Sequence, residues 1–321
     1  MNITVILCTY NRCHMLREAL NSAMAMKLPE YTTWEVLVVD NNSSDKTREV
    51  VTEIGTRYPG RVRYLFEPNP GKSHALNAGI RVALGDVVAF MDDDVTVDPL
   101  WLGNLTACLD QDEWAGTGGR IIPVWSSSPP NWLPREGRYP LGPLAMFDLG
   151  PQAGQLTESP IGTNMAFKRE VFEKHGAFRT DLGPRPGSEI RGEDSEFGNR
   201  LLAAGGRLRY EPSAIVYHPV QQDRIRKQYF LSWFFDKARS TVLEFGVPRD
   251  PRGQIWGVPL DLYLRLGVWT ARWMVAWEPS RRFSRKLNVW TVAGQIVECY
   301  RQSKTPGAGA LRQSLRRKET A

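Results

Sequence analysis

The sequence predicts an α/β fold, a mostly parallel sheet with helices on both faces, because short apolar runs alternate with helical patterns before residue 110. Four runs of strand length are rich in valine, isoleucine and leucine, at residues 3–8, 35–40, 62–66 and 87–91. Apolar positions recur near helical spacing between these runs, at residues 15–26, 46–58 and 73–84. This β-α-β-α order is typical of a parallel sheet covered on both sides.

The composition is that of an ordinary globular protein, since 321 residues with 42% hydrophobic side chains can bury a sizeable core. The formal net charge of +6 suits a nucleotide, a phospholipid head group or an acidic acceptor, and does not by itself indicate nucleic acid. The four cysteines lack CxxC spacing, so we expect neither a zinc cluster nor a disulfide framework. The N-terminus is unlike a signal peptide, and no apolar stretch has membrane-spanning length, which predicts a cytoplasmic protein.

Polar clusters follow three of the four predicted strands, at residues 9–12, 40–45 and 92–94. Ligands of parallel sheets bind beyond the carboxyl ends of the strands, so we expect these clusters to meet at one edge. The last cluster consists of three adjacent carboxylates, Asp92, Asp93 and Asp94. A bound Mg²⁺ or Mn²⁺ would relieve their repulsion. A solvated acidic turn is the alternative.

The second cluster and the loop after the third strand are candidates for nucleotide contacts. Asp40 can accept hydrogen bonds from a base or a ribose hydroxyl, and Ser44 can cap the next helix. Lys72 lies in a Pro-Gly-Lys-Ser segment, but a phosphate-binding P-loop would have a glycine where Phe66 stands. Pro70 also lacks the N–H group that such a loop uses. The remaining interpretation of Lys72 is a phosphate contact at a helix N-terminus.

Two more candidates lie in the second half of the chain. Asp194 follows Gly192 and Glu193 just before a helix predicted at residues 195–204, where it can act as a general base for an attacking hydroxyl. Acidic residues near a helix start also have a structural explanation, because they favour the helix dipole. His218 follows a strand predicted at residues 215–217 and is a metal ligand or a structural histidine.

The apolar periodicity stops after residue 123. Residues 125–160 contain seven prolines and predict an irregular insertion that serves as a lid or an acceptor loop. After this insertion the sequence predicts strands at residues 162–167 and 207–210 and helices at residues 228–245 and 260–277. We therefore expect a first domain over residues 1–245, a helical extension over 246–305 and a basic flexible tail over 306–321.

Tryptophan and basic residues gather between residues 255 and 290. Apolar side chains recur there at helical spacing, with charged ones on another face: Leu262, Leu266, Trp269 and Trp273 against Asp261, Arg265 and Arg272. The pattern suits a helix in a membrane interface, which would place the chain peripherally on the inner face of the cell membrane. It also suits a helix packed on the first domain.

Six motifs in order resemble the inverting glycosyltransferases of family 2, which have the GT-A fold. The motifs are VILCTYNR (5–12), VVDNNSSD (38–45), the series Asn69, Gly71, Ala75, Asn77 and Gly79, VAFMDDD (88–94), GTNMAFKR (162–169) and GEDSEFGNRL (192–201). The resemblance covers roughly residues 1–245, so the first domain is expected to be catalytic. The QxxRW signature of processive polysaccharide synthases is missing, which favours an enzyme that adds a single sugar.

The resemblance implies transfer of a sugar from a nucleotide-diphosphate donor, foremost a UDP-sugar, to the hydroxyl of a sugar or lipid-linked sugar, with inversion and with Mg²⁺ or Mn²⁺. It implies a role in bacterial cell-surface polysaccharide or glycolipid synthesis. The implied nucleotide and donor contacts are Thr9, Asn11, Arg12, Asp40, Asn42, Lys72, Asn77, Asp92 and Asp93. The implied metal ligands are Asp92, Asp94 and His218, and the groups facing the donor sugar and acceptor are Gly162, Thr163 and Asn164. Asp194 is the implied base, and Glu193 is the next candidate.

Two other functions remain open at this point. A sugar nucleotidyltransferase would use similar nucleotide and metal chemistry, but it needs a glycine-rich, basic N-terminal loop, and residues 9–12 contain no glycine. A non-catalytic module that binds nucleotide sugars is the other, and the intact Asp92, Asp94 and Asp194 argue against it.

Overall fold

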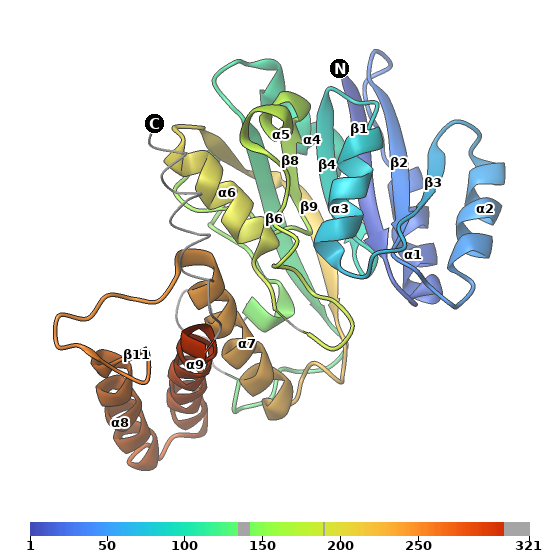
Figure 1. The fold of residues 1–321 in the computed structure, drawn as a ribbon. Helices are drawn as coiled ribbons and strands as arrows, with labels where there is room; N and C mark the ends of the chain where they lie inside the picture. The colour runs from blue at the N-terminus through green and yellow to red at the C-terminus, as the bar shows by residue number, and fades with distance from the viewer. Residues whose placement is uncertain (134–141, 189, 305–321) are drawn as a thin grey trace. The chain divides into compact units, whose positions relative to one another are not determined.

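The computed structural model describes residues 1–133, 142–188 and 190–304 (Figure 1). The tail predicted at residues 306–321 lies outside the described residues. The described part of the chain divides into two compact units, residues 1–128 with 142–225, and residues 129–133 with 226–304.

Four parallel strands form the part of the sheet that the sequence predicts. β1 (Asn2–Thr9) lies between β2 (Thr33–Asp40) and β4 (Val87–Asp92), and β3 (Val62–Phe66) pairs with β2. The register places Thr9 beside Asp40 and Cys8 beside Asp92. The parallel strands therefore end together, as the sequence analysis requires.

The rest of the sheet mixes directions. β8 (Met165–Lys168) runs antiparallel to β4 and to β6 (Gly116–Trp125), and β9 (Leu208–Val220) runs parallel to β6. β9 also pairs with β5 (Thr96–Val97) and with β7 (Gly154–Leu156), which lies inside the predicted irregular insertion. The prediction of two separate strands at residues 207–210 and 215–217 is wrong, because β9 continues through residues 212–214, where its pairing with β6 shifts register between Gly119 and Arg120.

Helices cover both faces of the sheet, which confirms the predicted layers (Figure 1). One core contains side chains of α1 (Cys13–Met24), α2 (Thr47–Arg57) and α4 (Trp101–Thr106), which is followed by the short η1 (Ala107–Asp110). The other contains side chains of α3 (Lys72–Val82), α5 (Arg169–His175) and α6 (Glu193–Ala203). A further short helix, η2, covers Gly142–Leu144. Alternate residues of β1 serve the two cores, with Leu7 in the first and Ile6 in the second.

The second unit is helical, with α7 (Lys227–Phe245), α8 (Leu260–Met274), α9 (Pro279–Lys304) and a small hairpin of β10 (Gln254–Ile255) and β11 (Val258–Pro259). The expected domain boundary after residue 245 differs from the structural division at residue 226. The reason is that α7 packs within this unit: Phe230 contacts Phe283 of α9, and Val242 shares a core with Val292.

Among the described helices, none is both long enough and apolar enough to cross a membrane.

Candidate active site

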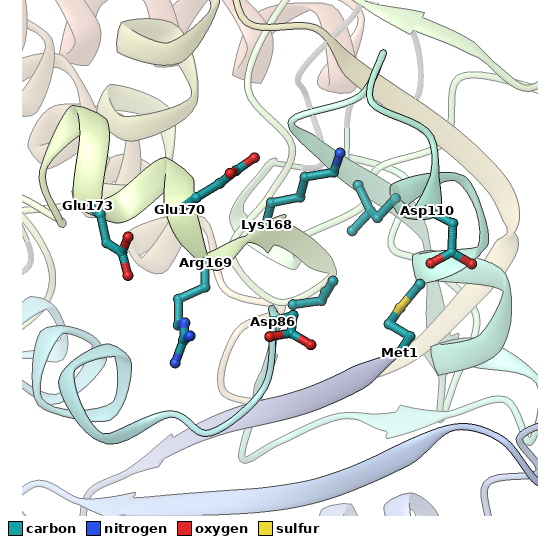
Figure 2. A pocket seen from close by; sticks show the side chains of 9 residues that line it. Met1, Asp86, Asp110, Lys168, Arg169, Glu170 and Glu173 are labelled. Atoms are coloured by element: carbon teal, nitrogen blue, oxygen red, sulfur yellow. The ribbon is translucent and has the colours of Figure 1, made fainter.

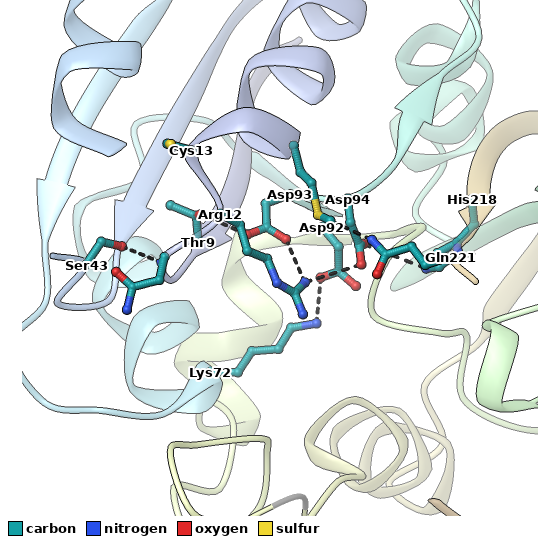
Figure 3. Close-up of polar contacts among 12 residues, drawn as sticks. Thr9, Arg12, Cys13, Ser43, Lys72, Asp92, Asp93, Asp94, His218 and Gln221 are labelled. Atoms are coloured by element: carbon teal, nitrogen blue, oxygen red, sulfur yellow. Dashed lines mark hydrogen bonds and ion pairs between the residues drawn. The ribbon is translucent and has the colours of Figure 1, made fainter. Parts of the chain in front are cut away.

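The site lies at the edge of the sheet where the parallel strands end. Thr9 closes β1, Asp40 closes β2 and Asp92 closes β4. Asp94 follows in the turn after β4, and Lys72 opens α3. Figure 3 shows Thr9, Lys72 and the acidic triplet converging from these elements. The structure thus brings together the segments that the sequence analysis assigns to one edge.

Asp93, the middle carboxylate of the triplet, is turned into the protein. It is only 5% exposed, accepts a hydrogen bond from the Thr9 hydroxyl at 2.8 Å and pairs with Arg12 at 3.1 Å. Burial raises the pKa of Asp93 to about 6, although the charge of Arg12 acts in the opposite direction. Thr9 and Asp93 bond to each other in the protein alone and so tie β1 to the turn after β4, and their contact with a nucleotide stays a prediction.

Lys72 links two carboxylates of the site. Its Nζ donates to Oδ1 of Asp92 at 2.6 Å, and Glu193 lies close enough to act on the same charge. Burial alone would lower the pKa of Lys72, but Asp92 and Glu193 raise it above its usual value, so the amine stays protonated. Burial alone would likewise raise the pKa of Asp92, which Lys72 holds below its usual value. A fixed positive charge therefore stands at the end of β4, where it suits a phosphate.

The backbone around Lys72 offers no open helix N-terminus. Its N–H donates to the carbonyl of Pro184 at 2.9 Å, and the N–H of Gly71 donates to Oδ1 of Asn41 at 2.7 Å. Gly71 has a φ of 134°, a conformation that side chains with a Cβ resist. The side chain of Lys72, and not its backbone, is the group that remains for a phosphate.

Asp94 is held between two arginines. Its Oδ2 accepts hydrogen bonds from Arg224 at 2.7 Å and from Arg12 at 3.3 Å. Arg224 also contacts Nε2 of His218 at 3.2 Å. Because arginine can only donate, this nitrogen accepts, and its lone pair faces the guanidinium. Arg224 is not predictable from the sequence, since nothing in the pattern separates it from the other 40 lysines and arginines.

Asp94 and His218 have the donor chemistry of a divalent-metal site. Burial lowers the pKa of His218, so its ring is neutral at pH 7, the form that binds metals. Its Nε2 lies 3.7 Å from Oδ1 of Asp94, and its buried Nδ1 has no hydrogen-bond partner among the described residues. The guanidinium of Arg224 already brings a positive charge to both groups. A carboxylate suits Mn²⁺ or Mg²⁺, and a neutral imidazole beside it is a common metal ligand.

The three predicted metal ligands do not form a complete metal site by themselves. Asp92 is paired with Lys72, and in residues 1–133, 142–188 and 190–304 no three acidic, histidine or cysteine side chains converge in a way that could hold a metal. Magnesium in nucleotide sites is usually held by one or two carboxylates together with substrate phosphates. Asp94 and His218 therefore remain as the candidate metal ligands of the protein, and Asp92 is ion-paired with Lys72.

Asp194 lies in the first turn of α6, which begins at Glu193 instead of Ser195. Its Oδ2 accepts a hydrogen bond from the N–H of Gly162 at 2.8 Å, and its Oδ1 accepts one from the N–H of Ser195 at 2.7 Å. A Cβ at residue 162 would lie 3.2 Å from Oδ2, so glycine permits this close approach. Oδ2 keeps a lone pair that can accept a proton.

Glu193 is less suited to meet an acceptor. It is 5% exposed, and burial together with the charge of Asp194 raises its pKa, while Lys72 acts in the opposite direction. Its carboxyl carbon would lie 3.5 Å from a Cβ at Gly183, so it is covered by that loop. Asp194, which is half-buried, is the better-placed base.

Asn164 and Asn77, two predicted ligand contacts, form hydrogen bonds with other parts of the protein. Asn164 accepts a hydrogen bond from the indole of Trp101 at 2.8 Å, and its amide donates to two backbone carbonyls at 2.9 Å each. Asn77 forms a reciprocal pair with the backbone of Phe178, at 2.8 and 2.9 Å. These amides brace the fold, and their contact with a ligand stays a prediction. Thr163 differs, since its buried hydroxyl makes no well-formed hydrogen bond among the described residues but lies near enough to Asp92 to lower the pKa of that carboxyl.

A hollow of about 390 Å³ lies at the ends of β2 and β3. Asp40 accepts hydrogen bonds there from the hydroxyl of Tyr64 at 2.8 Å and from the N–H of Ser43 at 2.9 Å. Phe66 is 49% exposed and offers a flat ring against which a base can stack. In the sequence, both aromatics have the pattern of ordinary strand residues. The full lining is Asp40, Ser43, Asp45, Arg48, Tyr64 and Phe66.

Polar residues beside this hollow shape its loops. Asn11 accepts a hydrogen bond from the N–H of Ser44 at 2.7 Å, which joins the loops after β1 and β2. Asn42 is exposed with a φ of 68°. The predicted cap at Ser44 is wrong, because α2 begins at Thr47 with Lys46 at the N-cap position and without a side-chain cap. The N–H of Thr47 donates instead to Asp45 at 3.1 Å.

A second hollow, of about 350 Å³, lies at the opposite end of the strands (Figure 2). Met1 and Val87, which line it, stand where β1 and β4 begin, away from the polar strand ends. Its other lining side chains are of mixed charge, including Asp86, Lys168 and Glu170. It contains none of the residues predicted to carry chemistry.

The sequence of the first unit matches the model of a known protein family. Residues 4–176, more than half of the chain, match the family model described as glycosyl transferase family 2. The chain belongs to glycosyl transferase family 2. The match spans the strand ends at Thr9, Asp40 and Asp92 and includes Gly162.

Family 2 proteins that resemble the chain come from archaea and bacteria. The glucosyl-dolichyl phosphate glucuronosyltransferase of Haloferax volcanii is 26% identical over 228 residues, 70% of this chain and 71% of its own. The succinoglycan biosynthesis protein ExoM of Rhizobium meliloti is 29% identical over 225 residues, 70% of this chain and 69% of its own. This membership makes the protein a glycosyltransferase, with relatives in polysaccharide and glycolipid synthesis, and favours neither a nucleotidyltransferase nor a binding module.

Solved structures agree on the GT-A fold. A mannosyltransferase from Pyrobaculum calidifontis, in complex with GDP-Man and Mn²⁺, has a TM-score of 0.54 at 20% identity, covering 98% of this chain and 79% of its own. Residues 1–349 of TarS from S. aureus, solved also with UDP, have a TM-score of 0.51 at 18% identity and cover 98% of this chain and 92% of theirs.

Proposed function

We propose that this glycosyltransferase moves a sugar from a nucleoside diphosphate to an acceptor hydroxyl with inversion, in the presence of a divalent cation. The observation that carries the proposal is the geometry of one loop. Gly162 contacts the carboxylate of Asp194, and its neighbour Thr163 acts on the charge of Asp92. Asp194 and Asp92 thus lie against adjacent residues of one loop, which suits a reaction centre between them.

Each group has a part in the reaction. The acceptor O–H gives its proton to Oδ2 of Asp194, and the acceptor oxygen forms a bond to the anomeric carbon. The bond from that carbon to the diphosphate oxygen breaks, and the leaving nucleoside diphosphate takes the electron pair. A single displacement of this kind inverts the anomeric centre. A divalent cation held by Asp94 and His218 would supply Lewis acidity toward the diphosphate.

The donor base fits the hollow at Asp40, between the ring of Phe66 and the hydroxyl of Tyr64. The similar structures contain GDP-Man with Mn²⁺ in one case and UDP in another, so both nucleotides belong in the first panel. The H. volcanii relative is a glucosyl-dolichyl phosphate glucuronosyltransferase, and ExoM is a succinoglycan biosynthesis protein. We therefore propose a sugar or a lipid-linked sugar as the acceptor, in surface polysaccharide or glycolipid synthesis, and a cytoplasmic setting.

Arg224 has a defined place in this proposal. In the protein alone its guanidinium neutralises Asp94 and faces the lone pair of His218. A bound cation would need that same carboxylate and that same lone pair as its ligands. If Asp94 and His218 held a divalent cation, the guanidinium of Arg224 would leave both groups and would be free to meet the phosphate charge of the donor.

Replacement of Arg224 by methionine should strengthen Mn²⁺ binding by about tenfold or more, because the competing charged hydrogen bonds are gone. The melting temperature without metal should fall, since Asp94 loses one of its two cations. Electron paramagnetic resonance of free Mn²⁺ measures the affinity. Arg17→Met is the matched control, because Arg17 pairs with Glu53 on an exposed surface away from the site. Unchanged or weaker Mn²⁺ binding by Arg224→Met would contradict the displacement.

Product analysis tests the proposed function. The protein, with Mn²⁺ and each nucleotide sugar of a panel, should release a nucleoside diphosphate, either by transfer or by slow hydrolysis of the donor. A nucleotidyltransferase would instead form pyrophosphate from a nucleoside triphosphate and a sugar phosphate. Chromatography separates the products. Pyrophosphate formation, or no turnover of any donor with cell-derived lipid or glycan acceptors added, would overturn the proposal.

A further inference from the structure

One face of α8 is apolar and lies in solvent. Leu264, Val268, Ala271 and Val275 are spaced four, three and four residues apart, which aligns them along one side of the helix. Leu264 is 56% exposed, Val268 50% and Val275 65%. We call these four residues the α8 apolar face. Such a continuous exposed apolar stripe indicates a surface that binds another protein or a membrane.

The α8 apolar face is distinct from the side that folds the second unit. Leu262 is buried, and Leu266 and Trp269 pack with it against Val292 and Cys299 of α9. The helix is therefore apolar on two sides, of which only one has a partner in this unit. Changes on the exposed side should leave the packed side intact.

Tryptophans stand beyond both ends of α8. Trp256 is 75% exposed and Trp277 is 95% exposed. Tryptophan has a large apolar body and one polar N–H group, which favours the boundary between lipid and water. Two such rings bracket the α8 apolar face.

Positive charge surrounds the same stretch. Between residues 255 and 290 the sequence has two acidic side chains, Asp261 and Glu278, and six basic ones, Arg265, Arg272, Arg281, Arg282, Arg285 and Lys286. Arg272 stacks over Trp269 at 5.0 Å, and Lys286 over Trp290 at 5.0 Å, so both cations are held at an aromatic surface. This excess complements anionic lipid head groups.

We propose that α8 lies in the surface of an anionic membrane, with the α8 apolar face among the acyl chains and the arginines at the head groups. A second copy of the chain fits this surface less well. In a twofold dimer the same patch faces itself, which would bring together two surfaces that each have an excess of positive charge. The proposal is independent of the transfer chemistry, so its failure would leave the proposed function standing.

Vesicle sedimentation with the full-length protein tests the proposal. Wild type should sediment with phosphatidylcholine vesicles that contain phosphatidylglycerol and should do so less with phosphatidylcholine alone or at high salt. The double variant Leu264→Glu, Val268→Glu should lose binding by about tenfold or more, because two apolar side chains assigned to the acyl chains are replaced by charges that lipid repels. Leu84→Glu is the matched control, since Leu84 is 68% exposed in the first unit.

Three results would overturn the proposal. Wild type that ignores anionic vesicles at low salt leaves no membrane role for α8. A double variant that is folded, by its melting temperature, and binds vesicles as wild type does would place the contact elsewhere. Self-association of lipid-free wild type in sedimentation velocity, lost in the double variant, would assign the α8 apolar face to a second copy.

Discussion

Asp194→Asn should lower turnover by about 10²–10⁴-fold, because the side chain keeps its size but can no longer take a proton. Nucleotide affinity should remain near that of wild type, since Asp194 is assigned to the acceptor and not to the donor. The amide retains one acceptor oxygen for the two backbone N–H groups of Gly162 and Ser195. We therefore also expect a loss of about 1–3 kcal/mol of stability, which is measured separately by thermal melting.

Glu196→Gln is the matched control for Asp194→Asn. Glu196 occupies the same first turn of α6 and pairs with Arg200 at 3.0 Å, so it loses the same charge at the same helix start. Its turnover should stay near wild type. If Asp194→Asn retains a third of wild-type turnover per folded molecule, Asp194 is not the base, and Glu193 becomes the candidate.

Asp94→Asn should weaken the Mn²⁺-dependent binding of a nucleoside diphosphate by at least about 100-fold. Changes to groups that merely support a metal ligand typically cost 10–100-fold, and a direct ligand should cost at least as much. The variant also leaves Arg12 and Arg224 without their shared carboxylate, so its melting temperature must be recorded. Calorimetric titration with and without Mn²⁺ measures the metal-dependent part.

Two further variants make the Asp94 result interpretable. Asp98→Asn removes the same charge at a helix start outside the acidic cluster and should bind as wild type. The double variant Asp94→Asn, Arg224→Met removes the uncompensated arginine and should recover stability without recovering the metal dependence. A stable Asp94 variant that binds nucleotide and Mn²⁺ like wild type would remove Asp94 from the metal site.

The sheet edge is predictable from sequence because it follows from chain order. Parallel strands with polar ends, such as those at Thr9, Asp40 and Asp92, must meet at one edge. The direction of each side chain there does not follow in the same way. Asp93 differs from its two neighbours in pointing inward to Thr9, and a run of three identical residues contains no sign of this.

Other parts of the site depend on long-range contacts that local patterns do not encode. Asn164 lies in a motif that predicts a ligand contact, yet the indole of Trp101, 63 residues away, holds its amide in the core. Arg224 reaches Asp94 across 130 residues. The domain boundary also shifts for a tertiary reason, because α7 packs on α9 although it is closer in sequence to the sheet.

The most direct test of the account is a thermal-shift panel of nucleoside diphosphates, beginning with UDP and GDP, each with and without Mn²⁺. A ligand at 100 times its dissociation constant stabilises the folded state by about 2.7 kcal/mol. At least one nucleotide should therefore raise the melting temperature by about 5 °C or more with Mn²⁺ and much less without it. If no nucleoside diphosphate shifts the melting temperature, or if the shift ignores Mn²⁺, the assignment of Asp94 and His218 to a metal-linked donor site is contradicted.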